Sequence, residues 1–463
     1  MVHPVKTLVV IGGGPAGYVA AITAARQGKK VTLIEQKDLG GTCLNEGCMP
    51  TKSLLASAET YEKIKKAEQF GITLPLEQVK INWDGVQYHK TAIVKNLVRG
   101  IGYLMKKNSI KVIKGEASFL TNHRLSVRNE NHVEEIEAEK FIIAAGSEPA
   151  SLPFAPFDGK WIIHSKQAMS LPAIPSTLLI VGGGVIGCEF ASIYSQMGTK
   201  VTIVEAADQL LPGEDADIAF TLQEELEKKG VAIYTSSSLT EMQPEDKTAL
   251  FKHKEELHEL QADYALISIG RKPRVLGLGL EQVGVHFSKQ GIDVNEHMQT
   301  NIPNIYACGD VVGGIQLAHV AFHEGTVAAL HACGKDKSVN YRAVPRCIYT
   351  HPEIASVGVT EKQARQEYGD IRVGEFSFTA NGKAMIANES VGKVKVIVEP
   401  QFNEIIGLSI VGSYATELIG QGTIMMHGEL TTDIMEDFIA AHPTLSEAIH
   451  EALLQSAGQA VHS

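Results

Sequence analysis

Long apolar runs, cysteine and positive charge are all scarce in this 463-residue sequence. No apolar run reaches the roughly 20 residues of a membrane-spanning helix, so no membrane span is expected. The first residues, MVHPVKTLVVIGGG, lead from an apolar run into glycines rather than to a cleavage site, and six cysteines are too few for a disulfide scaffold. Both features predict a cytoplasmic protein. A net charge of −11 argues against nucleic acid as the main ligand, although not against a basic protein partner.

One stretch of the sequence occurs twice. Residues 8–35 read LVVIGGGPAGYVAAITAARQGKKVTLIE, and residues 178–205 read LLIVGGGVIGCEFASIYSQMGTKVTIVE, at a constant offset of 170 (182 − 12 for the first glycine). Each copy is a β-branched run, a glycine turn, a helix-length segment and a second β-branched run that ends in Glu. This order is typical of a βαβ unit, so we expect two nucleotide-binding domains of similar plan.

The first glycine turn contains Gly12, Gly14 and Gly17, and Glu35 ends the strand that follows. Glycines at this spacing permit a tight turn and let the backbone approach a pyrophosphate, which the N-terminus of the next helix stabilises. Glu35 could accept the ribose hydroxyl groups. The alternative is a tight turn that binds no ligand, and the repeat disfavours it.

The second glycine turn contains Gly182, Gly184 and Gly187, and Glu205 ends its second strand. A Glu at this place suits the free ribose diol of NAD and repels the additional phosphate of NADP. The residues that follow, AADQLLPGED, contain no Lys or Arg that could bind this phosphate. The second unit therefore predicts NAD.

Two cysteines lie close together just after the first unit, in GGTCLNEGCMPTKSLL. Cys43 and Cys48 lie near an expected helix start, where the helix dipole favours a thiolate, and their spacing permits a disulfide. Lys52 follows Cys48 by one helical turn and could stabilise a thiolate or an anionic flavin. The alternatives are two buried thiols that pack as small apolar groups and an ordinary solvated lysine. The other four cysteines are interpreted as structural.

Three further residues have an ordinary interpretation as well as a functional one. Asp310 ends a strand at a glycine turn, where it could bind a polyol chain or cap a helix. His442 could be a surface histidine. Glu447 stands three residues after Thr444, so it could simply complete a capping box.

The remaining pattern predicts further elements. Helices are expected at about residues 83–107 and 317–332, and the Pro-rich residues 149–175 are interpreted as a linker. The strand within residues 304–314 has no partner in the second unit, so we expect it to return to the first. From about Val344, alternating strands precede helices, which is typical of an α+β domain with an antiparallel sheet.

Six motifs, GGGPAG, GGTCLNEGCMPTK, GGGVIGCE, GRKP, CGD with the later LAH, and HPTLSE, occur in this order along the chain. Together they resemble the pyridine nucleotide-disulphide oxidoreductases. The resemblance implies an α/β fold with two Rossmann-like domains, for FAD and NAD, and a C-terminal α+β domain that forms a homodimer. The implied divisions are residues 1–149 and 274–343 for FAD, 150–273 for NAD, and 344–463 for the dimer interface.

The resemblance also implies roles for individual residues. Cys43 and Cys48 would form a redox-active disulfide, and His442, oriented by Glu447, would act as a base in the active site of the other subunit. Lys52 and Glu189 would set the charge around the flavin ring. Further contacts with FAD are implied for Ala117, Asp310 and Ala318. A further contact with NAD is implied for Gly270. No metal site is expected.

Within the family, Glu205, HPTLSEA and a tail without cysteine are most similar to members that oxidise a protein-bound dihydrolipoyl group and reduce NAD. The expected partner is then the lipoyl-bearing acyltransferase core of a 2-oxo acid or acetoin dehydrogenase complex, and the cysteine segment favours acetoin or branched-chain systems. One alternative is an NAD(P)H-dependent reductase of a small disulfide or a metal ion. Another is a non-catalytic FAD-binding scaffold or redox sensor.

Overall fold

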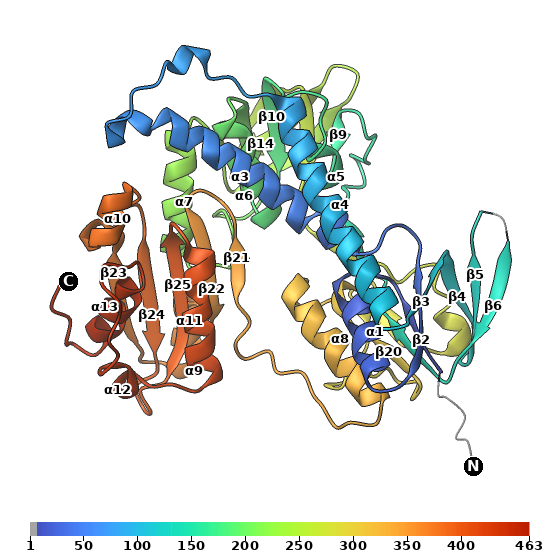
Figure 1. Ribbon diagram of the computed structural model, residues 1–463. Coiled ribbons are helices and arrows are strands. Elements are labelled where there is room, and N and C mark those ends of the chain that lie inside the picture. Colours follow the sequence, from blue (N-terminus) through green and yellow to red (C-terminus); the bar gives the residue numbers. More distant parts are fainter. Residues whose placement is uncertain (1–6, 131, 463) are drawn as a thin grey trace. The chain divides into compact units, whose positions relative to one another are not determined.

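The computed structural model describes residues 7–130 and 132–462 of the chain (Figure 1). These residues form two compact units. The first contains the chain up to Ser53, Asp84–Ala150 and Gly270–Val339. The second contains Leu54–Trp83, Ser151–Ile269 and the chain from Asn340 onward.

A five-stranded parallel sheet forms the centre of the first unit, in the order β20-β7-β1-β2-β3. Its strands are short runs rich in Val, Ile and Leu, as expected where a sheet is covered on both faces. Their bounds are Ile305–Ala307 for β20, Lys140–Ile143 for β7, Thr7–Ile11 for β1, Lys30–Glu35 for β2 and Lys111–Lys114 for β3. Because β20 pairs in parallel with β7, the chain returns to the first sheet, as its sequence predicts.

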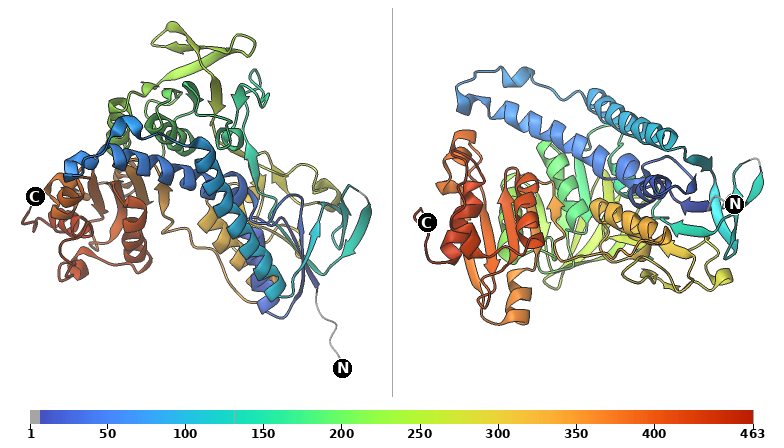
Figure 2. Two further views of the ribbon diagram at one scale, coloured as in Figure 1. Left: turned by 45° about the horizontal axis from the view of Figure 1, so that its top comes forward. Right: turned by 60° about the horizontal axis from the view of Figure 1, so that its bottom comes forward.

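Two helices of small residues, α1 (Pro15–Arg26) and α8 (Ala318–Ala332), pack against each other in this unit (Figures 1 and 2). Ala16 and Ala20 of α1 are buried. A Cβ on Gly325 of α8 would lie 2.3 Å from the carbonyl oxygen of Ala16. The small side chains therefore let the two backbones approach closely.

The other elements of the first unit are short apart from one long helix, α4, which has the predicted bounds, Trp83–Lys107. An antiparallel sheet contains β4 (Glu116–Thr121), β5 (Arg124–Arg128) and β6 (Val133–Glu137), and two strand pairs contain β8 (Ser147–Pro149) with β17 (Arg271–Pro273) and β18 (Phe287–Ser288) with β19 (Gly291–Ile292).

The second unit contains the second copy of the repeat. Its parallel sheet has the order β12-β11-β10-β16-β9. The pairing of β10 with β11 repeats that of β1 with β2, since Thr177 faces Lys200 as Thr7 faces Lys30. The bounds are Ala232–Tyr234 for β12, Lys200–Val204 for β11, Thr177–Val181 for β10, Tyr264–Ile267 for β16 and Ile162–Ile163 for β9, with Val185–Gln196 for α6 and Ala216–Lys228 for α7.

The interpretation of residues 149–175 as a linker was wrong. Ile162 and Ile163 form β9 and pair with β16 at the edge of the second sheet. Trp161 is buried, and its Nε1–H donates to the carbonyl oxygen of Ala262 at 2.9 Å. Prolines dominate the local composition, but the apolar Trp-Ile-Ile run gains more from joining a core than from solvent.

The last part of the second unit is an α+β arrangement, as predicted. Five antiparallel strands have the order β21-β22-β25-β24-β23. Helices α11 (Ala415–His427) and α13 (Glu447–Ser456) pack on them. The strand bounds are Arg346–Ile348 for β21, Glu353–Gly358 for β22, Ile405–Gly412 for β25, Lys393–Val398 for β24 and Arg372–Ser377 for β23.

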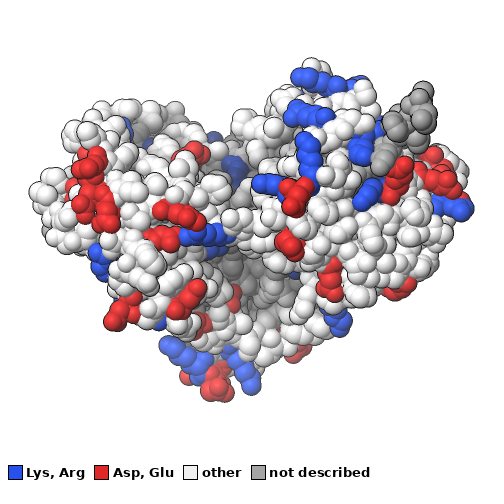
Figure 3. All heavy atoms as spheres, turned by 90° about the horizontal axis from the view of Figure 1, so that it is seen from below, with Lys and Arg blue, Asp and Glu red and all other residues white. Residues whose placement is uncertain are grey.

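Helix α3 (Cys48–Lys65) begins in the residues of the first unit and continues into those of the second. Further elements of the second unit are short. They include an antiparallel sheet of β13 (Ser237–Gln243), β14 (Thr248–His253) and β15 (Glu256–Gln261), and helices α5 (Ser165–Ala168), α9 (Glu361–Tyr368), α10 (Gly382–Ala387) and α12 (Thr432–Met435). None of the helices in the described part of the chain has the length and apolar character needed to cross a membrane. On the face drawn in Figure 3, basic side chains are interspersed with acidic ones.

Candidate active site

The first glycine turn lies between β1 and α1, and two of its glycines are required by the backbone. Gly12 has a φ of +103°, and a Cβ there would lie 2.2 Å from the carbonyl oxygen of Ala144. A Cβ on Gly17 would lie 1.9 Å from the carbonyl oxygen of Gly12. Gly14 caps α1 and has only a loose neighbour, Gly41 Cα at 3.8 Å from its Cβ position. The protein's own packing thus leaves the side of Gly14 open to a ligand.

Glu35 is held beside this turn by two backbone groups. Its Oε2 accepts from the N–H of Gly13 at 2.6 Å, and its Oε1 accepts from the N–H of Lys37 at 2.7 Å. A carboxylate oxygen has a second lone pair, so both oxygens can still accept a hydroxyl group. The arrangement fits the ribose of a dinucleotide.

The second glycine turn repeats this geometry. A Cβ on Gly182, at φ +104°, would lie 2.6 Å from the carbonyl oxygen of Ser268, and a Cβ on Gly187 would lie 2.0 Å from that of Gly182. Gly184 has no heavy atom within 4 Å of its Cβ position. Glu205 accepts from the N–H of Gly183 at 2.5 Å and from that of Ala207 at 2.6 Å. Both turns therefore fit a dinucleotide in the same way.

The cysteine segment forms two helices rather than one. Cys43 lies within α2 (Gly41–Glu46), whereas Cys48 begins α3 (Cys48–Lys65). Gly47 separates the helices with φ −151° and ψ −110°, which is not helical. Both cysteines are thiols here, and they are hydrogen-bonded to each other.

The thiol segment touches the first glycine turn. A Cβ on Gly41, which has a φ of +56°, would lie 2.6 Å from the Cα of Gly14. A dinucleotide in the first turn and the cysteine pair would therefore be close neighbours.

The environment of Cys43 opposes and favours its thiolate at once. The hydrogen bond to Cys48, then burial, raise the pKa of the Cys43 thiol, and the Lys52 ammonium acts to lower it. Lys52 thus supplies the positive charge that the sequence predicts beside the cysteines. The same positive charge would stabilise the cysteine thiolate that forms when a disulfide of these cysteines is broken.

A partly buried chain of hydrogen-bonded polar side chains lies in the same unit. The Ser147 hydroxyl donates to Asp310 Oδ2 at 2.5 Å, and Arg271 Nε donates to Ser147 Oγ at 2.7 Å. Asp310 belongs to the short 3-10 helix Gly309–Val312 that follows β20. Sequence reasoning predicted Asp310 but missed Ser147 and Arg271, whose only sequence signal is that they stand in FIIAAGSEP and GRKP.

The other residues predicted to touch the cofactors lie in varied places. Ala117 is buried in β4, and Ala318 is the first residue of α8. The carbonyl oxygen of Gly270 accepts from the N–H of Ala150 at 3.0 Å. Glu189 is buried in α6 of the second unit and accepts from the N–H of Tyr349 at 3.1 Å, whereas Lys52 belongs to the first unit.

His442 and Glu447 are hydrogen-bonded to each other at the start of α13. His442 Nδ1 lies 2.8 Å from Glu447 Oε1, and the N–H of Thr444 donates to Glu447 Oε2 at 2.7 Å. Burial acts to raise the pKa of Glu447, but Thr444 and His442 together lower it. The predicted capping box does not form, because α13 begins at Glu447 with Ser446 as its N-cap, and the Thr444 hydroxyl donates to the carbonyl oxygen of Ala441. The Glu447 carboxylate instead accepts from the Thr444 backbone and contacts His442. The His442 side chain is 79% exposed in the single chain.

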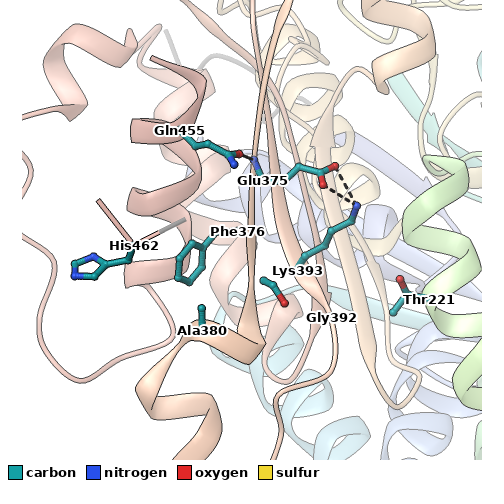
Figure 4. A pocket seen from close by; sticks show the side chains of 9 residues that line it. Thr221, Glu375, Phe376, Ala380, Gly392, Lys393, Gln455 and His462 are labelled. Carbon is teal, nitrogen blue, oxygen red and sulfur yellow. Dashed lines mark hydrogen bonds and ion pairs between the residues drawn. The ribbon is translucent and has the colours of Figure 1, made fainter. Parts of the chain in front are cut away.

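A cavity of about 590 Å³ lies in the second unit, between β23, β24 and the end of the chain (Figure 4). Lys393 Nζ and Glu375 Oε1 are 3.0 Å apart on its wall, and the backbone N–H of Glu375 donates to Gln455. It is lined by none of the predicted site residues. Within the described ranges, no group of three or more His, Cys, Asp or Glu could hold a metal ion.

Comparison with known proteins agrees with this geometry. The family model for pyridine nucleotide-disulphide oxidoreductases matches residues 6–325, and the model for the dimerisation domain of that family matches residues 344–453. A dihydrolipoyl dehydrogenase of Bacillus subtilis is 58% identical over 457 residues, covering 99% of this chain and 100% of the relative. One from Geobacillus stearothermophilus is 38% identical, covering 98% and 97%.

Solved structures agree as well. LpdA from Mycobacterium tuberculosis has a TM-score of 0.90 at 30% identity, covering 97% of this chain and 99% of that one. The HOCl-induced flavoprotein disulfide reductase RclA from Escherichia coli, solved as a Cu(II) complex, has a TM-score of 0.87 at 30% identity, covering 98% and 100%. The chain belongs to the pyridine nucleotide-disulphide oxidoreductases, enzymes that use FAD and NAD, and it carries their dimerisation domain.

Proposed function

We propose that this oxidoreductase is a dihydrolipoyl dehydrogenase, which oxidises protein-bound dihydrolipoamide to lipoamide and reduces NAD+ to NADH. The observation that carries the proposal is the pair of hydrogen-bonded thiols, Cys43 and Cys48, beside the first glycine turn. The full-length relative at 58% identity supports the choice of substrate.

FAD would lie on the first glycine turn and NAD on the second. Gly12, Gly14, Gly17 and Glu35 would hold the adenosine and pyrophosphate of FAD. The further contacts proposed for FAD are Lys52, Ala117, Asp310 and Ala318. The contacts proposed for NAD are Gly182, Gly184, Gly187, Glu189, Glu205 and Gly270. Residues 1–149 and 274–343 would form the FAD domain, 150–273 the NAD domain and 344–463 the interface.

The thiols would carry the substrate half of the reaction. A substrate thiolate attacks Cys43 of the oxidised pair, the Cys43–Cys48 bond breaks, and Cys48 leaves as a thiolate. The second substrate thiol, once deprotonated, attacks the mixed disulfide, so lipoamide leaves and Cys43 takes the electron pair. Lys52 would stabilise the thiolate form of the pair.

His442 would remove the substrate proton, and Glu447 would orient its ring and stabilise the imidazolium. The exposed histidine suits a role in the active site of a second subunit, so we propose a homodimer in which each chain completes the other's site. Cys48 would give up its electron pair to FAD held on the first glycine turn, and the chemistry that FAD supplies when bound would be hydride transfer to NAD+. Lys52 and Glu189 would set the charge around the flavin ring.

Glu205 would select NAD over NADP, since its fixed carboxylate suits the ribose diol and repels a phosphate there. The macromolecular partner would be the lipoyl-bearing acyltransferase core of a 2-oxo acid or acetoin dehydrogenase complex. A thiol pair that cycles freely suits the reducing cytoplasm, where we place the enzyme.

The His442→Gln variant tests the assignment of the base. Turnover with dihydrolipoamide should fall by about 10²- to 10⁴-fold, because a positioned general base is lost. Transfer of electrons from NADH to an artificial acceptor should remain near the parent rate, because it bypasses the thiol exchange. Steady-state rates of the two reactions on the purified holoenzyme give the comparison.

Equal losses in both reactions would contradict the role of His442. The choice of substrate distinguishes a dihydrolipoyl dehydrogenase from the alternative function, an NAD(P)H-dependent reductase of a small disulfide or a metal ion. Lipoamide with NADH should be preferred over glutathione disulfide with NADPH, and the reverse preference would replace the proposed function by that candidate.

A further inference from the structure

We propose that Arg271 is a positioning residue for the flavin, which acts through Ser147 to fix the carboxylate of Asp310. This inference rests on the proposed contact of Asp310 with FAD. It is independent of which dithiol the enzyme oxidises.

The donors and acceptors in this chain allow only one direction. Arg271 can only donate, and the Asp310 carboxylate can only accept. Because Arg271 Nε donates to Ser147 Oγ at 2.7 Å, the single hydroxyl proton of Ser147 is left to donate to Asp310 Oδ2 at 2.5 Å. Arg271 Nη2 also donates to the carbonyl oxygen of Ser147 at 2.9 Å. Two bonds therefore fix the serine, and the serine fixes the carboxylate.

The hydrogen bond from Ser147 uses one carboxylate oxygen of Asp310, Oδ2, and leaves Oδ1 for another donor. Arg271 Nε lies 4.0 Å from Oδ2, so the guanidinium also attracts that oxygen directly. Asp310 Oδ1 has no polar protein partner among the residues that the structure describes. With Oδ2 anchored, Oδ1 is available for a hydroxyl group of a bound polyol.

Burial makes these bonds matter. Ser147 is buried, and the side chains of Arg271 and Asp310 are 17% and 25% exposed. Burial lowers the pKa of Arg271 and the charge of Asp310 raises it, so each partly buried ion favours the charged form of the other. Charged hydrogen bonds of this kind are stronger than neutral ones, and their loss leaves a partly buried carboxylate without its donor.

Three distant segments meet in this chain, and the backbone holds two of them rigidly. Ser147 begins β8 and Arg271 begins β17, and these strands pair antiparallel with Arg271 opposite Pro149. Lys272, the next residue of β17, is exposed and belongs to the same strand. It offers a matched control for a change at Arg271.

The experiment measures FAD binding to the apoprotein by quenching of flavin fluorescence. Arg271→Gln and Ser147→Ala should each raise the Kd for FAD by about 10- to 100-fold, the effect of losing a charge-assisted hydrogen bond. Lys272→Gln should leave the Kd unchanged, and Ser147→Thr, which keeps the hydroxyl, should restore binding. Adding Arg271→Gln to Asp310→Asn should cause no further loss, because Arg271 acts through Asp310.

The outcomes separate the inference from its premise. An unchanged Kd in Asp310→Asn would remove the premise, and the inference with it. If Asp310→Asn weakens binding but Arg271→Gln binds FAD like the parent, or if the two losses add, the inference is wrong and the proposed function stands. Should Ser147→Ala fail to fold, the Arg271→Gln and Asp310→Asn cycle decides alone.

Discussion

At the residue scale, the two dinucleotide turns are built from the same contacts. Glu35 and Glu205 each accept one N–H from their glycine turn and one from the residue that stands two positions after the glutamate itself. In each turn, two glycines are required by close backbone contacts, while the middle one, Gly14 or Gly184, has room for a ligand. Because the protein's own packing does not require glycine at the middle position, a substitution there tests whether a ligand binds.

Alanine at Gly184 and at Gly187 should therefore have different effects. Gly187→Ala places a Cβ 2.0 Å from a backbone oxygen, so it should lower the thermal stability of the protein, by about 1–3 kcal/mol or more. Gly184→Ala meets no protein atom within 4 Å, so stability should be unchanged while the Kd for NADH rises about tenfold or more. Thermal unfolding and NADH titration measure the two quantities. Parent-like NADH binding by Gly184→Ala would argue against a dinucleotide at this turn.

At the scale of elements, the sequence predicted those helices and strands whose pattern lies within one continuous stretch of residues. The β-branched runs and glycine turns of the repeat, helix α4 and the antiparallel last sheet follow from sequence periodicity. The break at Gly47 between α2 and α3 was missed, although a glycine followed three residues later by Pro50 is a helix-stop signal that could have predicted it. Strand β9 was missed because prolines surround it, and the link from Arg271 to Asp310 exists only after β8 and β17 pair.

The contact between α2 and the first glycine turn yields a prediction for Gly41→Ala. Its Cβ would lie 2.6 Å from the Cα of Gly14, at a φ of +56° that disfavours side chains. The thiol segment should shift, and FAD should be lost more readily on dialysis, with a Kd raised about tenfold or more. Gly100→Ala in α4, where no atom lies within 4 Å, is the control and should retain FAD. Equal FAD retention in both variants would show that this contact is not needed.

At the scale of the whole molecule, the dimerisation domain leaves its proposed base, His442, and several apolar side chains exposed in the single chain. His442 is 79% exposed, and Ile424 and Ile434 are 71% and 60% exposed. Because the family's dimerisation domain matches residues 344–453, we expect a partner subunit to cover these apolar side chains. The sequence could predict this domain but not what its surface touches, since such contacts involve a second chain.

A monomeric variant should therefore separate cofactor binding from turnover. Ile424→Glu combined with Ile434→Glu places two charges among exposed apolar groups and should favour the monomer. The monomer fraction isolated by size-exclusion chromatography should retain FAD but oxidise dihydrolipoamide at least about 10²-fold more slowly, because it lacks the partner's base. A monomer with parent activity would contradict a site shared between subunits.

The proposed storage of an electron pair by Cys43 and Cys48, between substrate and flavin, is tested most directly by an anaerobic reductive titration. Each disulfide and each flavin takes two electrons. The parent holoenzyme should therefore consume two equivalents of dithionite per flavin, and Cys43→Ala, which cannot form the bond, should consume one. A parent enzyme that is fully reduced by one equivalent, or a variant that still takes two, would contradict the account.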